Sequence, residues 1–312
     1  IRYCLLSRGL GDVYKRQEGV WVSVFTAISA FCNAGFDLFG RFGAYSSLVP
    51  YVNNYYVQAV VMFMIMAGGL GFMVWVELAE YRKKRRLSLH AKVVLQFSAI
   101  FWVGGAVLLA LLEWSNPKTM GGLSVPSKLM AALFQSVSTR TAGMNTIDLA
   151  ACSPISKLLM SVLQFIGAAP GSTGGGVKVT TFAVLILTIR SVAQGRDDCV
   201  IGGHHIESKT VYRALTIIVL GAVAAFGSAV VVYYNTAETV SVIDCIFESC
   251  SAFGTVGLSV GVTGQLNTGA KLLYMACMFM GRVGPASLAI SLTAKPDDNK
   301  RKVLPVGHIN VG

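Results

Sequence analysis

Three short clusters of small residues, each containing a glycine, have the composition needed to bind a cation through backbone carbonyl groups. They read SAFCNAGF (residues 29–36), VSTRTAGM (residues 137–144) and SAFGTVGL (residues 251–258). Aligned on Gly35, Gly143 and Gly257, they are separated by 108 and 114 residues, and this near-constant period indicates an internal repeat. Glycine permits a positive φ, so successive carbonyls can face one axis, where they replace the hydration shell of an alkali cation.

The residues beside each glycine are also small, which suits such a filter. The predicted filter residues are Asn33, Ala34, Gly35, Phe36, Thr141, Ala142, Gly143, Met144, Thr255, Val256, Gly257 and Leu258. A single glycine turn at membrane depth is often only a packing element, but three copies with the same polarity favour a filter. The apolar segments hold almost no acids away from their ends, which disfavours a proton relay.

A second glycine cluster, GAAPGSTGGGVKVTTF (residues 167–182), lies inside the apolar run 155–190. As one helix this run would be about 54 Å long, well beyond the hydrocarbon thickness of a bilayer. Pro170 and the glycines after it predict a break, with two helices joined by a loop at about mid-membrane. Such a loop must face a cation path, which suits a gate. The predicted gate residues are Gly171, Ser172, Thr173, Gly174, Gly175, Gly176, Lys178 and Arg282.

Three basic residues lie near these clusters. Arg282, in GRVGP, is too deep in an apolar segment for an unpaired charge, so we expect it to face the loop carbonyls or to form an electrostatic barrier to cations. Lys178 either faces the inner vestibule or extends to the interface. Arg140 either braces the filter from behind or forms an external salt bridge.

Other site chemistries fit less well. Gly171 and Gly176 have the G-x-x-x-x-G spacing of a phosphate-binding loop, but Val177 stands where the lysine should follow and no strand pattern precedes. The seven cysteines form no CxxC pair, and His204 and His205 are expected to be solvated. We therefore predict no enzyme, no bound metal other than a transported cation and no cofactor.

The elements that must position these residues are membrane helices. The chain of 312 residues is 54% hydrophobic and 13% charged, with a mean hydropathy of +0.62, whereas soluble domains carry about 25% charged residues. The predicted crossing segments are residues 55–81, 91–114, 155–190, 210–234 and 268–294. Shorter half-helices are predicted at residues 22–31, 128–138 and 242–253, each ending at a filter glycine cluster.

Charge gives the orientation. The net charge is +11, but basic residues gather one membrane width beyond each filter glycine, as in RKKRR (residues 82–86), so we predict a membrane protein rather than a nucleic-acid-binding one. All three filter turns then face outside. Acids fall on the same outer half: Asp37, Asp148, Glu238, Asp244 and Glu248.

The motifs FTAISAFCNAGFDLFG, FQSVSTRTAGMNTID, GAAPGSTGGGVKVTTF, SAFGTVGLS and MFMGRVGP carry a resemblance that runs from about residue 22 to the C-terminus. Through them the sequence resembles the Trk/Ktr/HKT superfamily of potassium transporters and is most similar to KtrB-type subunits. The resemblance implies an all-α integral membrane fold of four helix–pore-loop–helix units around one pseudo-fourfold pore. It implies one filter glycine per unit, an intramembrane gating loop at residues 167–176, and a pore-facing arginine at Arg282.

The same resemblance implies K⁺ as the transported ion, with Na⁺ as a coupling ion. It further implies a homodimer in the bacterial plasma membrane, resting on a cytosolic ring of nucleotide-binding regulatory subunits. Two functions stay open at this point. The first is a K⁺ uptake subunit that conducts through the filter under control of the loop, and the second is a non-conducting, membrane-embedded binding or regulatory fragment of a cation transporter.

The family's first unit has no counterpart, so we expect an N-terminally truncated form of a longer transporter. The expected organisation is a non-native start (1–17), the second pore unit without its first helix (18–86), the third pore unit with the broken inner helix (87–200), the fourth pore unit (201–302) and a cytoplasmic tail (303–312).

Overall fold

The computed structural model describes residues 10–284 except 43–45, 196–198, 202–203 and 237–238. Its helices are α1 (Leu10–Phe31), α2 (Tyr55–Gly69), α3 (Phe72–Lys84), α4 (Leu89–Glu113), α5 (Val125–Ser138), α6 (Pro154–Phe165), α7 (Val179–Ala193), α8 (Ser208–Asn235), α9 (Val242–Phe253) and α10 (Thr268–Val283). Three short 3-10 helices lie at Phe39–Phe42, Val49–Tyr51 and Thr263–Gln265. The expected tail 303–312, residues 1–9 of the expected start and Glu238 lie outside the described residues.

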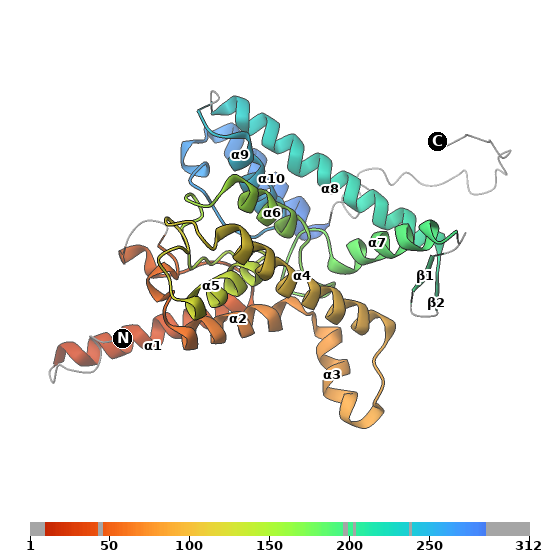
Figure 1. Ribbon diagram of the computed structural model, residues 1–312, viewed down its shortest axis with the longest axis horizontal. Coiled ribbons are helices and arrows are strands. Elements are labelled where there is room, and N and C mark those ends of the chain that lie inside the picture. The colour runs from red at the N-terminus through yellow and green to blue at the C-terminus, as the bar shows by residue number, and fades with distance from the viewer. Residues whose placement is uncertain (1–9, 43–45, 196–198, 202–203, 237–238, 285–312) are drawn as a thin grey trace.

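Two described helices, α4 and α8, are long and apolar enough to cross a membrane. They correspond to the predicted crossings 91–114 and 210–234, whereas the prediction of one uninterrupted crossing at residues 55–81 is wrong. Residues 285–294 of the predicted crossing 268–294 lie outside the described residues. Residues 55–81 are divided into α2 and α3, which meet at an angle of 100°. Gly71, between them, has φ +85°, a conformation that ends α2 and redirects the chain. In Figure 1, α3 projects away from the rest of the bundle.

Residues 155–190, where the glycine content predicts a break, form α6 and α7 joined by residues 166–178. The two ends of this connection stay close, because the amide of Gly167 donates to the Val177 carbonyl at 2.8 Å and the amide of Val177 donates to Phe165 at 3.1 Å. The connection is therefore a closed loop in which the glycine cluster returns on itself. We call residues 167–176 the glycine-rich loop.

Three helices end at the clusters predicted to form the filter. They are α1, α5 and α9, and each ends within a few residues of an aligned glycine. α5 and α9 match the predicted half-helices closely, whereas α1 begins at Leu10 and is longer than the predicted 22–31. Side-chain caps start α9, where Ser241 accepts from the amide of Ile243, and α6, where Ser153 accepts from Ser156.

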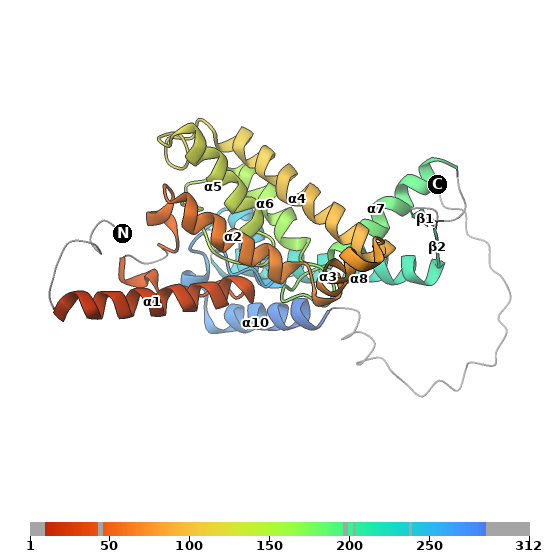
Figure 2. The ribbon, with the colours of Figure 1, turned by 90° about the horizontal axis from the view of Figure 1, so that it is seen from below.

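The helices pack as a bundle around the ends of these half-helices. α5 packs on α4 and α2, and α9 packs between α8, α6 and α10. The two groups meet where α6 contacts both α4 and α9. α1 and α10 lie on one side of the molecule, while α7 and the strands lie at the end remote from the start of α1 (Figure 2).

One small β-sheet is present in addition to the predicted helices. β1 (Cys199–Ile201) pairs antiparallel with β2 (His204–Ile206), with Val200 opposite His205. This hairpin joins α7 to α8, and its first strand spans the boundary predicted between residues 200 and 201. Cys199 is buried against Thr188 of α7, so the hairpin is packed onto the helices.

Candidate cation site

The three glycine turns share one backbone conformation. We name them the first turn (33–36), the second turn (141–144) and the third turn (255–258). In each, both the glycine and the residue two before it have positive φ. The values are 49° and 72° for Asn33 and Gly35, 83° and 82° for Thr141 and Gly143, and 52° and 89° for Thr255 and Gly257. A β-branched residue such as threonine rarely adopts positive φ, and strain of this kind concentrates at functional sites.

A serine in the last turns of each half-helix fixes the carbonyl that follows each glycine. The Ser29 hydroxyl donates to the Phe36 carbonyl at 2.7 Å, and the Ser251 hydroxyl donates to Leu258 at 2.7 Å. The Ser138 hydroxyl donates to the Met144 carbonyl in the same way. The sequence analysis missed these serines, although their position five or six residues before the glycine was a usable signal.

The three turns lie against one another. A Cβ placed at Gly35 would be 2.7 Å from the carbonyl oxygen of Ala142 and 3.2 Å from the Cα of Gly143. A Cβ at Gly143 would overlap the carbonyl oxygen of Val256. Segments more than 100 residues apart therefore bring bare backbone to one place. Ala142, Val256, Met144 and Leu258 are buried there, whereas the Phe36 side chain is 70% exposed and only its carbonyl is engaged.

Three consecutive residues of the glycine-rich loop contact equivalent positions in the three turns. Thr173 Oγ1 lies 2.7 Å from Asn33 Nδ2. A Cβ at Gly174 would overlap Thr141 Oγ1, and a Cβ at Gly175 would overlap Thr255 Oγ1. The loop therefore lies directly against the residue two before each filter glycine.

Not every predicted gate residue takes part in this contact. A Cβ at Gly171 would lie 3.1 Å from the ring of Phe72, and the Ser172 hydroxyl donates to Ala169 at 2.5 Å within the loop itself. The amide of Gly176 donates to Gly281 of α10 at 3.1 Å. Residues 173–175 thus face the turns, while the flanking residues attach the loop to the helices around it.

The bend between α2 and α3 is in direct contact with the glycine-rich loop. The amide of Thr173 donates to the Gly68 carbonyl at 3.2 Å, and the amide of Phe72 donates to the Gly171 carbonyl at 3.1 Å. A Cβ at Gly71 would lie 2.5 Å from the Pro170 carbonyl oxygen. The bend therefore exposes backbone groups that the loop satisfies, which is the condition for irregular backbone inside a membrane.

Small residues also bring the half-helix ends close to the neighbouring helices. A Cβ at Gly68 of α2 would overlap the carbonyl of Phe31, and a Cβ at Gly281 of α10 would overlap that of Phe253. Phe31 and Phe253 are each the last residue of their half-helix. Glycine on the facing helix allows this approach, as in tightly packed membrane helices.

Three cationic side chains donate to carbonyls of the glycine-rich loop. Arg282 Nη1 donates to Thr173, and Lys178 Nζ donates to Gly174 at 2.6 Å. Arg140 Nη2 donates to Gly167 at 2.8 Å, and its guanidinium lies 5.2 Å from the centre of the Phe101 ring. Arg140 is only 4% exposed, so it braces the loop from inside and forms no external salt bridge with the described residues.

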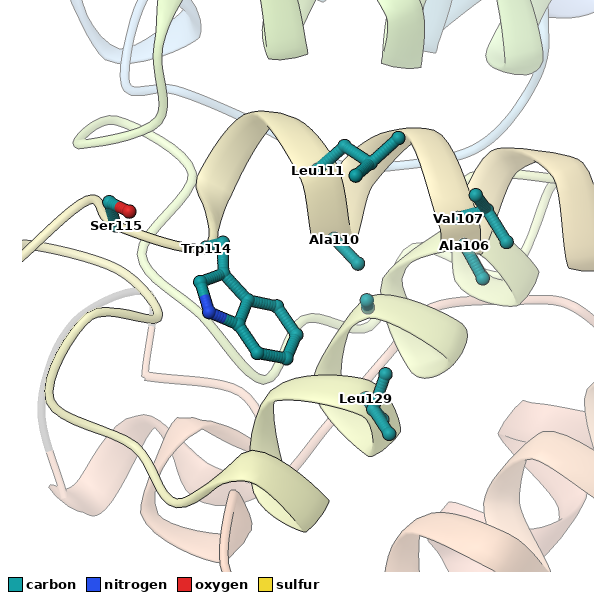
Figure 3. A pocket seen from close by; sticks show the side chains of 8 residues that line it. Ala106, Val107, Ala110, Leu111, Trp114, Ser115 and Leu129 are labelled. Carbon is teal, nitrogen blue, oxygen red and sulfur yellow. The ribbon is translucent and has the colours of Figure 1, made fainter.

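An apolar hollow in the described part of the chain lies elsewhere. It is a groove of about 660 Å³ between α4 and α5, with the side chains of Trp114 and Leu129 at its wall (Figure 3). Ser115 is the one polar side chain among the described residues that line it, so the groove offers few ligands to a cation. Among the described residues no group of three or more His, Cys, Asp or Glu side chains is arranged to hold a metal ion. The glycine turns, whose bare backbones meet, are the candidate cation site.

Comparison with known proteins gives consistent matches. A sequence model of the TrkH family, described as a cation transport protein, matches residues 8–302. The potassium/sodium uptake protein NtpJ of Enterococcus hirae is 37% identical over 280 residues, covering 89% of this chain and 61% of that protein. The Ktr system potassium uptake protein B of Vibrio alginolyticus is 38% identical, covering 95% of this chain and 66% of that protein.

The protein of the same name from Bacillus subtilis is 33% identical, covering 99% of this chain and 67% of that protein. The chain therefore spans about two thirds or less of the length of these relatives. Among solved structures, the potassium transporter TrkH from Vibrio parahaemolyticus superimposes with a TM-score of 0.69 at 18% identity, covering 92% of this chain and 65% of that one. This likeness concerns the fold.

Proposed function

Because this chain belongs to the TrkH family of cation transport proteins, we propose that it acts in K⁺ uptake across a membrane. The three glycine turns are the cation filter, and the glycine-rich loop is the gate. The chain is membrane-embedded and does not act as an enzyme.

The observation that carries this proposal is the meeting of the three turns. Gly35 lies against the carbonyls of Ala142 and Val256, and Gly143 lies against the Val256 carbonyl, so backbone from three remote segments meets in one place. Backbone carbonyls in such a ring substitute for the water around an alkali cation. The serine bonds to Phe36, Met144 and Leu258 hold the outermost carbonyls in fixed positions, which a selective filter requires.

The gate proposal rests on the position of the loop. Thr173, Gly174 and Gly175 contact the three turns at equivalent positions. With the orientation predicted from the basic clusters, this is the inner end of the proposed filter. The Arg282 contact with Thr173 and the Lys178 contact with Gly174 hold the loop there. A cation leaving the filter must displace the loop, and the glycines provide the freedom to move.

The same proposal extends to partners and coupling. K⁺ is the transported ion and Na⁺ the coupling ion. The subunit works as a homodimer on a cytosolic ring of nucleotide-binding regulatory subunits, in a bacterial plasma membrane. The two ions are proposed from the names of the Ktr and NtpJ relatives. The homodimer, the regulatory ring and the plasma membrane are proposed from the resemblance to the Ktr family alone.

Rb⁺ uptake in a bacterial strain that lacks its own K⁺ uptake systems tests the transport function. Two forms are compared: this chain, and the longest natural reading frame that contains it. Uptake by either form, abolished by Gly143→Ser, supports the proposal. Absence of uptake by both, despite membrane insertion, would reject transport and favour the non-conducting binding or regulatory role.

The gate is tested in a form that transports. Deleting two glycines within residues 171–176, and separately replacing Arg282 by Gln, should raise the maximal rate of Rb⁺ uptake because both changes release the loop. Replacing Arg190, which is exposed at the end of α7, by Gln is the matched control. Unchanged flux in both loop variants would reject the gating role and leave the filter assignment intact.

A further inference from the structure

We propose that Glu248 is a positioning residue for the third turn and contributes to K⁺ selectivity, an inference that rests on the proposed filter. Glu248 lies on α9, nine residues before Gly257, and only 4% of it is exposed. None of the transport steps above uses it. Its carboxylate is directed at the segment that follows the third turn.

Five donors from that segment converge on this one carboxylate. Oε1 accepts from the Ser259 hydroxyl at 2.5 Å and from the amides of Val260 at 3.2 Å, Val262 at 3.0 Å and Thr263 at 3.4 Å. Oε2 accepts from the Thr263 hydroxyl at 3.0 Å. An ionised carboxylate is the side chain that accepts at both oxygens at once, and hydrogen bonds to a charged group are the stronger kind.

This arrangement fixes the outer side of the third turn. Ser259 directly follows Leu258, whose carbonyl is held by Ser251. Thr263 begins the 3-10 helix Thr263–Gln265, so the carboxylate also occupies the amino end of that helix. Two side chains of α9 therefore hold consecutive residues beyond Gly257, and the carbonyl direction at Leu258 depends on both.

The third turn differs from the other two in what faces its glycine. A Cβ at Gly35 or Gly143 would touch a neighbouring turn, whereas a Cβ at Gly257 would meet nothing within 4 Å in the described part of the chain. The positions equivalent to Glu248 in the other half-helices are Thr26 and Phe134. The carboxylate thus occurs in the repeat whose glycine has no lateral contact of this kind.

The charge has a consequence of its own. The neighbouring acid, Asp244, pairs with Lys157 at 2.7 Å, but Glu248 forms no ion pair with any described residue. Its donors are neutral hydroxyl and amide groups, so they distribute its charge without cancelling it. A negative charge beside the proposed filter favours cation entry, and the geometry it imposes on the turn favours K⁺ over Na⁺.

Glu113 provides a matched control. It is also a buried carboxylate bound by a loop, accepting from Asn116 at 2.7 Å, Thr119 at 2.6 Å and the amide of Ser153 at 2.8 Å. None of these partners belongs to a glycine turn. If the effect of a substitution comes only from the loss of a buried carboxylate, Glu248→Gln and Glu113→Gln should behave alike. If it comes from a change in the geometry of the filter, only Glu248→Gln should show it.

The first test measures transport in Glu248→Gln, Glu248→Asp, Ser259→Ala and Glu113→Gln. For Glu248→Gln we expect the K⁺/Na⁺ uptake ratio to fall by about tenfold and the KM for K⁺ to rise, with partial recovery in Glu248→Asp. Ser259→Ala keeps the charge and loses one contact, so the ratio should fall with little change in KM. Equal effects of Glu248→Gln and Glu113→Gln on the ratio would overturn the proposal.

The second test does not depend on transport. Amide hydrogen exchange of the purified protein should be at least about tenfold faster at residues 260–263 in Glu248→Gln, and unchanged there in Glu113→Gln. Unaltered exchange in α4 and α8 of each variant shows that the variant keeps the overall fold. If the unsubstituted protein carries no Rb⁺, the proposed function fails, and exchange alone then decides the positioning role. Unchanged exchange at residues 260–263 would refute it.

Discussion

The Thr173 hydroxyl accepts a hydrogen bond from Asn33 Nδ2 at 2.7 Å and donates to the Phe31 carbonyl at 3.0 Å. One side chain of the glycine-rich loop thus joins both the first turn and the end of the half-helix before it, across 140 residues of sequence. The hydroxyl uses both its acceptor and its donor capacity in contacts outside the loop. We expect it to stabilise the loop against the proposed filter.

Thr173→Val should therefore release the loop, because valine keeps the shape and loses the hydroxyl. We expect the maximal rate of Rb⁺ uptake to rise severalfold, corresponding to the loss of about 1–2 kcal/mol of hydrogen bonding. Thr173→Ser retains the hydroxyl and serves as the control. A rate in the valine variant equal to that of the serine variant would exclude this contact as part of the gate.

The glycines of the second and third turns should tolerate serine differently. At Gly143 a side chain would overlap the Val256 carbonyl, so Gly143→Ser should abolish uptake. At Gly257 the described surroundings leave room, and the cost is the positive φ of 89°, about 1 kcal/mol. Gly257→Ser should keep uptake and weaken K⁺ over Na⁺ discrimination. Competition of Rb⁺ uptake by Na⁺ measures this, and unchanged selectivity would contradict the assignment of Gly257.

Arg140→Gln should destabilise the protein. Burial leaves the guanidinium dependent on the Gly167 carbonyl and the faces of Phe101 and Trp102, and glutamine replaces neither the charge nor the ring contacts. We expect a loss of about 2–4 kcal/mol in the free energy of unfolding, seen as a lower thermal midpoint in detergent. Arg190→Gln, at an exposed position, should leave the midpoint unchanged. Equal midpoints for the two variants would argue against a bracing role.

The pair formed by Lys157 of α6 and Asp244 of α9 should couple these two helices. Their charged atoms are 2.7 Å apart and the side chains are only 10% and 23% exposed, so solvent screens the pair weakly. A double-mutant cycle with Lys157→Met and Asp244→Asn should give a coupling free energy of about 1–3 kcal/mol in thermal unfolding. The pair Lys84 and Glu80, which is exposed on α3, is the comparison and should give less than about 0.5 kcal/mol. Additive effects at Lys157 and Asp244 would show that the pair is not coupled.

Much of the site could be located from residue types and spacing. The near-constant period of the three glycine clusters predicted the turns at residues 33–36, 141–144 and 255–258, because glycine permits a positive φ at little steric cost. The apolar run 155–190 is too long for one crossing and contains helix-breaking glycines, and these two features together predicted separate helices, which are α6 and α7. High apolar content and few charges indicated a membrane protein.

Local sequence patterns did not predict features that depend on contacts between residues far apart in the chain. Residues 55–81 read as one span because a single Leu70–Gly71 step in a continuous apolar run carries no polar signal. The chain bends at Gly71 because of two contacts with the glycine-rich loop. The Pro170 carbonyl lies where a side chain at Gly71 would be, and the Gly171 carbonyl accepts from the amide of Phe72. For the same reason neither alternative for Arg140, bracing the filter or forming an external salt bridge, named its partner, the Gly167 carbonyl of the glycine-rich loop.

The sequence by itself determined which residues have the conformational freedom to form the turns and the loop, since that freedom depends on the residue and its immediate neighbours. Only the tertiary structure decided that Thr173, Gly174 and Gly175 meet the three turns in order, and that Glu248 gathers the donors of residues 259–263. These contacts depend on how helices far apart in the chain pack together, and helix packing is set by the combined surfaces of many side chains rather than by any one stretch.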